Sequence, residues 1–549
     1  MRQSAVSLLL LLAAGCAKPD YDVIIRHGTV YDGSGGAPMA ADLALRGDRI
    51  AAVSALDAAR GRIEIDARGL AVAPGFVNMM TSGTTLFADG RSQSEIRQGV
   101  TLAVMGEGES MGPLTPEMRA YFEKLEGDIK YPMPWSTLRE GLDTLARQGV
   151  SCNIASFVGA ATVRENVLGF ANRPPSAEEL QKMRTIVRQA MQEGALGVAS
   201  ALIYAPGAYA KTDELTALAE EAAKGGGIYI SHVRNESNRV VEAIDELIAI
   251  SRASHAPAEI YHLKEAGKDN WGKLDTVIQH VESAHREGLR ITADMYTYDA
   301  GATGLDASMP PWVQEGGYDE WAKRLQDPAI RQRVAREMRT ASDQWDNLLL
   351  ATGSPERVLL VSFKNDKLKP YTGKTLAEVA RIRGKSPEET AMDMVVEDGS
   401  RVGTIYFLMS EDNVRRQIQL PWLSFCSDED SQAPEGVFLK SNPHPRAYGS
   451  FIRVLGKYSR DEKLIPLQEA VRKLAALPAE NLGLKDRGLL KAGYFADVVV
   501  FDPAKVQDHA TYEKPHQYAT GMVHVFVNGT QVLKDGEHTG AKPGRVVLH

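Results

Sequence analysis

The sequence contains little cysteine, no excess of basic residues and no apolar run long enough to cross a membrane. Its 549 residues include three cysteines, at positions 16, 152 and 426, which are too few for a disulfide framework or a cysteine-rich zinc site. The formal net charge of -8 leaves the chain without the basic footprint of nucleic-acid-binding proteins, so we predict no nucleic-acid partner. With 44% hydrophobic and 24% charged residues, the composition is that of an ordinary globular protein, which excludes a disordered or collagen-like chain.

Residues 1–20 have the pattern of a lipoprotein signal peptide and tether. A single basic residue, Arg2, precedes a short apolar run from Ala5 to Ala14, which is the layout of a signal peptide. The Leu-Ala-Ala-Gly-Cys segment that ends at Cys16 resembles a bacterial lipobox. It predicts cleavage before Cys16, lipidation of its thiol and membrane contact only through this lipid anchor. Because Ala17 carries no inner-membrane retention signal, we predict the periplasmic side of the outer membrane; the alternative is a plain signal peptide with an incidental cysteine.

Short alternating strands at both ends of the chain predict one small β-sandwich domain, formed from residues 21–72 and 480–549. The N-terminal part contains YDVIIRHGTV and ADLALRG, and the C-terminal part contains ADVVVFDP and a hairpin signal at Asn528-Gly529. The segment between them, residues 73–479, is expected to form a separate domain.

This middle segment alternates buried strands with amphipathic helices, a pattern typical of parallel βα units. We expect helices at 176–194, 212–227 and 273–288, which begin near Ser or Thr or end with Gly. The eight strands are expected at about 71–80, 100–107, 152–159, 197–202, 228–233, 258–264, 290–298 and 423–428. Eight such units predict an α/β fold, a (β/α)8 TIM barrel whose chemistry lies at the carboxyl ends of the strands.

A long insertion interrupts the last unit. Residues 306–420 are mostly helical in pattern and precede the eighth strand. Because loops that follow barrel strands lie over the active-site face, we interpret this insertion as a lid or a substrate-selecting subdomain. The alternative is structural elaboration without a role in the reaction.

Two histidines fall at the ends of neighbouring strands. Of the twelve histidines in the chain, His232 ends the fifth strand and His262 ends the sixth. A single histidine at such a position is usually a hydrogen-bonded core residue. Two imidazoles aimed at one barrel mouth are suited to share a divalent cation such as zinc.

A zinc ion needs a third protein ligand and an open position for water, so another donor is expected at a strand end. Glu107 and Glu109 both follow the second strand, and either is an ordinary loop carboxylate if it is not a ligand. Asp428 follows the apolar eighth strand, where a carboxylate can take a proton from water and pass it to a departing amine. The alternative for Asp428 is a helix N-cap.

Ordered sequence blocks between residues 21 and 545 carry a family resemblance. The chain is similar to the D-aminoacylase, or N-acyl-D-amino-acid deacylase, branch of the amidohydrolase superfamily. The matching blocks include APGF (73–76), RQGVT (97–101), SHVRNES (231–237), YHLK (261–264), YTYDAGATGLDASMPPW (296–312), PHPRAYGSFIRVLGKY (443–458) and GYFADVVVFDP (493–503). The resemblance implies a barrel with a β-sandwich domain and zinc-dependent hydrolysis of an amide on a D-amino acid.

The resemblance implies a set of zinc ligands. His232 and His262 match the two histidines that hold the tightly bound zinc. A cysteine on the second strand completes this site in the family, and alignment on the following SMGPL places Glu107 at its position. Alignment from the preceding side places Gly108 there instead. We therefore predict Glu107 as the third ligand, with Glu109 as the alternative.

The resemblance also implies catalytic and substrate-binding residues. Asp428 matches the catalytic aspartate. Lys264, Tyr296 and Arg446 match residues that hold the substrate carboxylate, with Tyr298 as the alternative to Tyr296. Arg446 suits this role because its planar guanidinium pairs with a carboxylate through two parallel hydrogen bonds.

Several histidines of the family pattern are absent. The H-x-H motif after APGF falls on Met80 and Ser82, neither of which is a good zinc ligand, and Asn78 stands where an aspartate is usual. A family histidine on the third strand is replaced by Ala160. Because the resemblance implies that the first-strand half-site binds only a weak second metal, we predict one Zn2+ per chain.

The combined prediction is a mononuclear zinc amidohydrolase that cleaves the amide bond of N-acyl-D-amino acids or related dipeptides. One alternative is hydrolysis of a cyclic amide or another C-N bond on the same scaffold. Another is a non-catalytic binding lipoprotein, which the missing histidines motivate. We favour the enzyme because His232, His262 and Asp428 are retained together, which a binding protein does not require.

Overall fold

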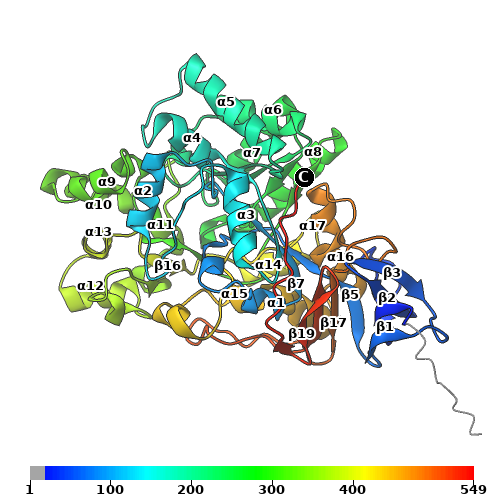
Figure 1. Cartoon of the computed structure of the whole chain (residues 1–549). Helices are drawn as coiled ribbons and strands as arrows, with labels where there is room; N and C mark the ends of the chain where they lie inside the picture. Colours follow the sequence, from blue (N-terminus) through cyan, green and yellow to red (C-terminus); the bar gives the residue numbers. More distant parts are fainter. Residues whose placement is uncertain (1–18) are drawn as a thin grey trace, which may run out of the picture.

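The computed structural model describes residues 19–549, so the predicted lipid attachment at Cys16 lies outside the described residues. Figure 1 shows a large α/β body with a small β-sheet domain at one end and the helices of the insertion at the other. Within residues 19–549, no helix has both the length and the apolar character that a membrane crossing requires. Cys152 and Cys426 are buried and do not form a disulfide bond.

The two ends of the chain are joined in one β-sheet. The order of its strands is β20-β19-β18-β17-β5-β1-β2-β3, with β4 paired to β1. Strand β17 runs antiparallel to β5, with Val499 opposite Ala73, so this pair connects the N-terminal and C-terminal parts. The strands are β1 (Tyr21–Val30), β2 (Met39–Arg46), β3 (Arg49–Ser54), β4 (Gly61–Asp66), β5 (Ala71–Pro74), β17 (Val498–Phe501), β18 (Met522–Val527), β19 (Thr530–Lys534) and β20 (Glu537–His538).

Alternation along these strands buries one apolar face of the sheet. Ile25, Leu43, Val498 and Phe526 share a core in which each of these side chains has no solvent exposure. After β20 the chain leaves the sheet and returns to the barrel, where the Val547 N–H donates to the Ile154 carbonyl at 2.8 Å.

A ring of parallel strands forms the centre of the large domain. The first three barrel positions pair in the order β6-β7-β8, and the sheet β9-β10-β11-β12-β13 continues the ring. The strands are β6 (Phe76–Asn78), β7 (Val100–Met105), β8 (Asn153–Ser156), β9 (Val158–Gly159), β10 (Gly197–Ala201), β11 (Ile228–His232), β12 (Ala258–Ile260) and β13 (Ile291–Ala293). The strands at the third and seventh barrel positions are shorter than expected. At the third position the strand is divided into β8 and β9, and at the seventh position β13 ends at Ala293.

Residues 423–428 close this ring without forming a regular strand. The Ser424 N–H donates to the Ala293 carbonyl at 2.8 Å, and the Asp428 N–H donates to the Met80 carbonyl at 3.0 Å. These bonds connect the seventh and first barrel positions through the eighth. The predicted α/β barrel is therefore confirmed, with an extended segment at its eighth position.

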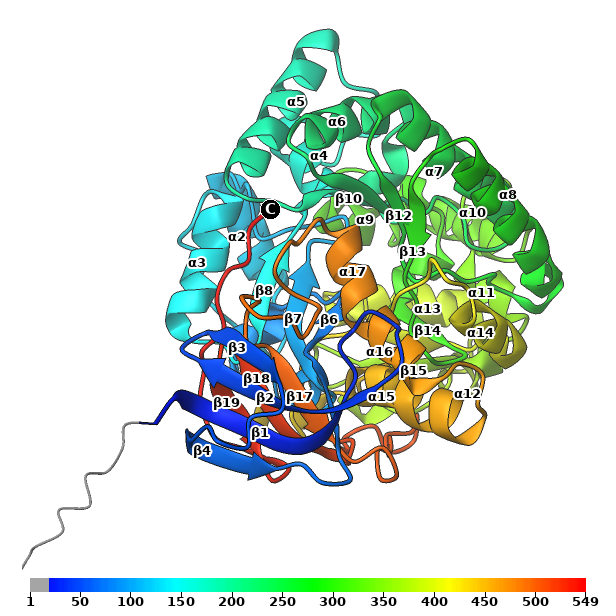
Figure 2. The same ribbon diagram turned by 90° about the vertical axis from the view of Figure 1, so that its right-hand side faces the viewer.

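Amphipathic helices cover the outside of the ring, as Figure 2 shows for α5 to α8 around β10 to β13. Ser176 begins α5 with a capping box, in which its hydroxyl accepts from the Glu179 N–H and the Glu179 carboxylate accepts from the Ser176 N–H. The covering helices are α3 (Leu138–Gln148), α4 (Ala160–Leu168), α5 (Ala177–Gln192), α6 (Thr212–Lys224), α7 (Val240–Ser254) and α8 (Leu274–Arg286). Further helices are α1 (Gln93–Ile96), α2 (Pro116–Leu125), α15 (Arg446–Arg453), α16 (Leu467–Leu474) and α17 (Ala476–Asn481).

The insertion contains two strands as well as helices, and these strands form a sheet with residues 301–304, which precede the insertion. Its helices are α9 (Tyr318–Arg324), α10 (Pro328–Met338), α11 (Leu348–Thr352), α12 (Leu376–Arg383), α13 (Pro387–Asp398) and α14 (Glu411–Ile418). An antiparallel sheet in the order β14-β16-β15 combines β14 (Gly301–Gly304), β15 (Val358–Ser362) and β16 (Gly403–Tyr406). The expectation of a mostly helical insertion was therefore incomplete, because pairing between strands far apart in sequence leaves only a weak local signal.

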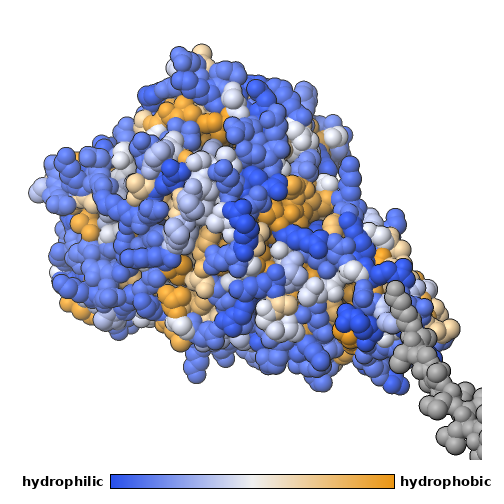
Figure 3. Space-filling model, in the orientation of Figure 1, coloured by the Kyte–Doolittle hydropathy of each residue, from blue (hydrophilic) through white to orange (hydrophobic). Residues whose placement is uncertain are grey.

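The face of the molecule in Figure 3 is mostly hydrophilic, with separate apolar patches rather than one continuous apolar surface.

Candidate metal centre

A cavity of about 950 Å³ opens at the carboxyl ends of the barrel strands. His232, His262 and Asp428 line it from the barrel, and Arg401 and Ser362 line it from the insertion. The insertion thus contributes part of the cavity wall, which agrees with its interpretation as a covering subdomain.

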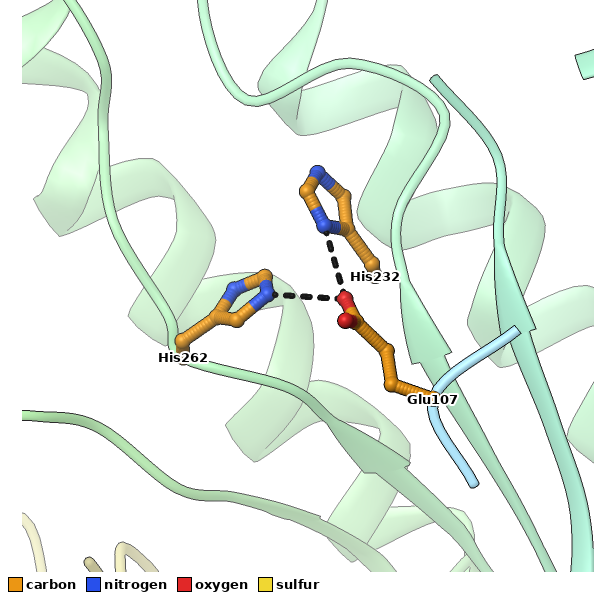
Figure 4. Close-up of side chains that lie close together, drawn as sticks. All are labelled: Glu107, His232 and His262. Carbon is orange, nitrogen blue, oxygen red and sulfur yellow. Dashed lines mark hydrogen bonds and ion pairs between the residues drawn. The ribbon is translucent and has the colours of Figure 1, made fainter. Parts of the chain in front are cut away.

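Three potential metal ligands converge in this cavity, as Figure 4 shows. Glu107 Oε1 lies 3.0 Å from His232 Nδ1 and 3.3 Å from His262 Nε2. One ligand atom from each of the three residues lies within 4.8 Å of the other two. Among residues 19–549, the structure brings Glu107 into this group and not Glu109.

The backbone aims each of these side chains at the cavity. His232 is the last residue of β11, and His262 follows β12 with a positive φ of 35°. The Asp294 carboxylate accepts the His262 N–H at 2.8 Å and so holds this uncommon conformation. Glu107 follows Gly106, whose φ is +105° and where an added Cβ would meet a backbone oxygen at 2.4 Å.

A buried carboxylate that the sequence reasoning missed, Glu236, lies beside the nitrogens on the opposite sides of both imidazole rings. Its Oε1 lies 3.0 Å from His262 Nδ1, and its Oε2 lies 3.5 Å from His232 Nε2. Its Oε1 also accepts from Lys264 Nζ at 2.7 Å. The available signal was its place four residues after His232 in SHVRNES, but only the folded loop turns it back toward the rings.

This arrangement fits a zinc ion. Two imidazole nitrogens and one carboxylate oxygen are a donor set that zinc accepts, with a further position left for water. Histidines that bind metals usually donate their other ring N–H to a carboxylate, which fixes the tautomer. Glu236 stands in that position for His262 at 3.0 Å, and it lies 3.5 Å from His232 Nε2, which has no hydrogen-bond partner within residues 19–549.

The electrostatic field at the proposed metal site favours positive charge. Burial alone would raise the pKa of Glu107, but hydrogen bonds from His232 and His262 lower it to about 2. Burial and Lys264 oppose protonation of His262, yet the surrounding carboxylates, Glu236 foremost, raise its pKa to about 9. A cation held between the three ligands would be stabilised by these same carboxylates.

Asp428 and Arg446 form an ion pair at the cavity wall. Arg446 Nη1 lies 2.6 Å from Asp428 Oδ2, and Arg446 Nε lies 3.5 Å from Glu429 Oε2. Burial raises the pKa of Asp428, and the Arg446 guanidinium opposes that shift. Asp428 adopts a φ of 51°, which directs its side chain from the end of the eighth barrel segment into the cavity.

Tyr296 and Lys264 also line the cavity. The Tyr296 ring centroid lies 4.4 Å from Arg446 Cζ and 5.5 Å from Lys264 Nζ, so two cations face one aromatic ring. The Lys264 ammonium contacts His262 Nδ1 at 2.7 Å in addition to Glu236. Tyr298 contacts Arg453 instead, with 4.3 Å between the ring centroid and Cζ.

The first-strand positions without histidine have other contacts. Asn78 Nδ2 donates to Glu95 Oε1 at 2.9 Å and to Ser427 Oγ at 2.7 Å, which ties the first barrel strand to the eighth segment. The Ser82 hydroxyl donates to Asp430. Met80 lines the cavity but offers only a thioether.

Comparison with known proteins identifies the family. The model described as "Amidohydrolase family" matches residues 64–533. The chain belongs to the amidohydrolase family. A D-aminoacylase of Alcaligenes xylosoxydans xylosoxydans is 34% identical over 540 residues, a match that covers 96% of this chain and 97% of that relative.

Solved structures of this amidohydrolase's relatives agree with its fold. An N-acyl-D-glutamate deacylase from Bordetella bronchiseptica, complexed with zinc and a phosphonate inhibitor, has a TM-score of 0.80 at 30% identity. It covers 96% of this chain and 100% of its own. A D-aminoacylase described by one-metal activation and second-metal attenuation of a binuclear centre has a TM-score of 0.81 at 33% identity, with the same coverage. The predicted D-aminoacylase resemblance is confirmed, and the protein is an amide-bond hydrolase of this metal-dependent group.

Proposed function

We propose that this amidohydrolase is a mononuclear zinc enzyme that cleaves the amide bond of N-acyl-D-amino acids or related dipeptides. The observation that carries the proposal is the convergence of Glu107, His232 and His262, backed by Glu236, in a cavity that Asp428 also lines. The named activities of the relatives, D-aminoacylase and N-acyl-D-glutamate deacylase, support this substrate class.

In this proposal Glu107, His232 and His262 hold the zinc ion. When bound, zinc supplies a Lewis acid that polarises a carbonyl and makes water easier to deprotonate. Asp428 takes the proton of the attacking water and delivers it to the departing amine. The raised pKa of Asp428, caused by burial, suits a carboxylate that must both accept and release a proton.

Arg446 and Tyr296 are proposed to hold the α-carboxylate of the substrate, with Lys264 beside them. The Arg446 Nε and Nη1 atoms are buried and lack a hydrogen-bond partner within residues 19–549, although Asp428 lies in ion-pair range. A substrate carboxylate would supply the acceptors that these donors lack, since leaving a buried donor unsatisfied costs free energy.

Two features support a single zinc. Met80 and Ser82 replace the histidines expected for a second metal, and Ser82 is already bonded to Asp430. Asp428 is paired with the Arg446 guanidinium, so its charge is balanced by a side chain rather than by a second cation. The one-metal activation described for the related D-aminoacylase agrees with a one-zinc enzyme.

The test combines metal analysis with a substrate panel. Purified protein is expected to contain about one zinc per chain and to release amino acids from N-acetyl-D-amino acids in preference to their L forms. Glu107→Ala is expected to lose zinc, whereas Glu109→Ala is expected to keep it. Turnover of cyclic amides alone would overturn the substrate assignment, and a folded, metal-free protein without amidase activity would identify a binding protein.

A further inference from the structure

We propose that Glu109 selects substrates with a cationic side chain, so that the preferred substrates are N-acyl-D-amino acids carrying an ammonium or guanidinium group. This inference rests on the proposed function for the reaction and adds the chemical class of the side chain. It is carried by the charge pattern of the cavity, by the isolation of Glu109 and by the wall against which Glu109 lies.

Carboxylates dominate the cavity. Nine Asp or Glu residues line it, against four Lys or Arg residues. Even with one divalent cation held by Glu107, the carboxylates outnumber the positive charges. The negative electrostatic potential of such a cleft attracts cationic ligands and repels anionic ones.

The four basic residues of the cavity already have partners. Lys264 contacts Glu236 at 2.7 Å, and Arg446 contacts Asp428 at 2.6 Å. Arg401 Nε lies 2.9 Å from Asp306 Oδ1. The fourth, Lys364, donates to the backbone carbonyl of Lys124 at 2.7 Å. Lys264 and Arg446 are proposed to hold the α-carboxylate, so an acidic side chain of the substrate would have to draw Arg401 or Lys364 away from these partners.

Glu109 is in the opposite situation. Its side chain is exposed, lines the cavity and makes no hydrogen bond or ion pair with any residue in the described range 19–549. The Arg401 guanidinium attracts this carboxylate from a distance but is itself paired with Asp306 at 2.9 Å. Its N–H donates to the Glu107 carbonyl at 2.6 Å, so the two residues share one tight turn beside the proposed metal ligands. A side chain of a bound substrate extending from the reacting centre therefore meets a carboxylate that is available for pairing.

The turn that carries Glu109 is attached to the start of α4. The Ala161 N–H donates to the Gly108 carbonyl at 2.9 Å, and the Ser110 N–H donates to Thr162 Oγ1 at 2.8 Å. Ala161 itself lines the cavity. Residues four apart share a helix face, so Glu165 lies one turn farther along the face that Ala161 presents.

Glu165 is a second carboxyl group without a partner. It is 5% exposed, and both of its oxygens are buried with no hydrogen-bond partner among residues 19–549. A buried polar group in this condition costs free energy unless something pairs with it. Glu165 is not among the residues that line the cavity, but burial and the neighbouring Glu109 carboxylate raise its pKa, so the two carboxyl groups lie near each other behind this wall.

Aromatic side chains complete this part of the wall. Tyr121 and Phe170 line the cavity with 5.1 Å between their ring centroids, and the Tyr121 hydroxyl accepts the Tyr318 N–H at 3.0 Å. Tyr318 and Trp321 line the same cavity. Aromatic faces beside a carboxylate are a favourable environment for an ammonium or guanidinium group.

The test compares matched substrates by kcat/KM. N-acetyl-D-lysine and N-acetyl-D-arginine are expected to exceed N-acetyl-D-norleucine, which has a similar length without charge, by about 10- to 100-fold. N-acetyl-D-glutamate is expected to be the poorest of the four. Glu109→Gln should remove most of the preference for lysine over norleucine, and Glu109→Lys should shift the preference toward glutamate.

The matched control is Glu282→Gln, which neutralises an exposed glutamate on α8 outside the cavity and should leave all ratios unchanged. Zinc content and thermal unfolding of each variant establish that it is folded. If the wild-type protein prefers the neutral or acidic substrate, or if Glu109→Gln leaves the ratio unchanged, the inference is wrong.

A binding measurement separates this inference from the proposed function. Calorimetric titration with N-acetyl-D-lysine and N-acetyl-D-norleucine reports the side-chain preference even if neither compound is hydrolysed. Tighter binding of the lysine compound without turnover would support the cationic site while contradicting the deacylase. Equal binding without turnover would overturn both.

Discussion

Replacement of Glu236 by glutamine should weaken zinc binding without removing any proposed ligand. Glu236 contacts the outer ring nitrogens of both histidines, at 3.0 Å for His262 Nδ1 and 3.5 Å for His232 Nε2. Carboxylates in this position orient metal ligands, and their loss typically lowers metal affinity by about 10- to 100-fold. That range corresponds to about 1.4 to 2.7 kcal/mol of binding free energy.

The structure gives a specific reason to expect a loss of zinc affinity in the upper half of this range. Lys264 Nζ lies 2.7 Å from His262 Nδ1 and is equally close to Glu236. The Glu236 carboxylate accepts from Lys264 and lies 3.0 Å from Nδ1, so it competes with Nδ1 for the Lys264 protons and can accept the Nδ1 proton, which leaves Nε2 free to bind a metal. Without that charge, the Lys264 ammonium can donate to Nδ1, which shifts the ring proton to Nε2 and blocks the ligand atom.

The assay is competition for zinc between the protein and a chelator of known affinity, together with activity at saturating zinc. Glu265→Gln is the matched control, because burial raises the pKa of Glu265 to about 8 and its carboxyl group is mostly uncharged near neutral pH. This variant should bind zinc like the wild type. Wild-type affinity in Glu236→Gln would refute the proposed orienting role, as would an equal loss in both variants.

Three further outcomes are expected. Gly106→Ala should displace Glu107 and reduce zinc content, because its φ is +105° and the new Cβ would meet a backbone oxygen at 2.4 Å; Gly272→Ala, where a Cβ meets nothing within 4 Å, should retain zinc. Burial and the nearby Asp294 raise the pKa of Glu259 to about 8, so the folded state binds the extra proton and stability falls as pH rises from about 4.5 to 8. Glu259→Gln should therefore raise Tm at pH 8 and have little effect near pH 4.5, which thermal unfolding at both pH values checks; a gain independent of pH would contradict this. Cys16→Ser should move the protein from the membrane to the soluble fraction, because it removes the predicted lipid attachment site; cell fractionation measures this, and an unchanged distribution would contradict the lipid anchor.

The barrel and the positions of its histidines were predictable because they depend on local pattern. Alternating βα units specify parallel strands, and parallel strands bring their carboxyl ends to one mouth. His232 and His262 end neighbouring strands in the sequence, so their convergence followed from the order of the units. The helix that begins after Ser176 was predictable for the same local reason, its capping box.

The insertion was predicted less completely. Its helices have local periodicity, but the sheet that joins β14, β16 and β15 depends on pairing between segments about 40 to 100 residues apart. The contribution of Arg401 to the cavity wall depends on that sheet, because Arg401 lies two residues before the start of β16.

The sequence by itself determined the fold class, the family and the strand-end histidines, since periodicity, turn signals and ordered motifs are written along the chain. The sequence did not distinguish Glu107 from Glu109 as the third potential ligand, because both belong to one short turn. In the folded loop, Glu107 lies beside the two histidines and Glu109 lines another part of the cavity. Tertiary structure also decided the position of Glu236 behind the imidazoles and the pairing of Arg446 with Asp428. These contacts join residues whose distance in space is set by loop geometry and barrel closure, which spacing along the sequence does not encode.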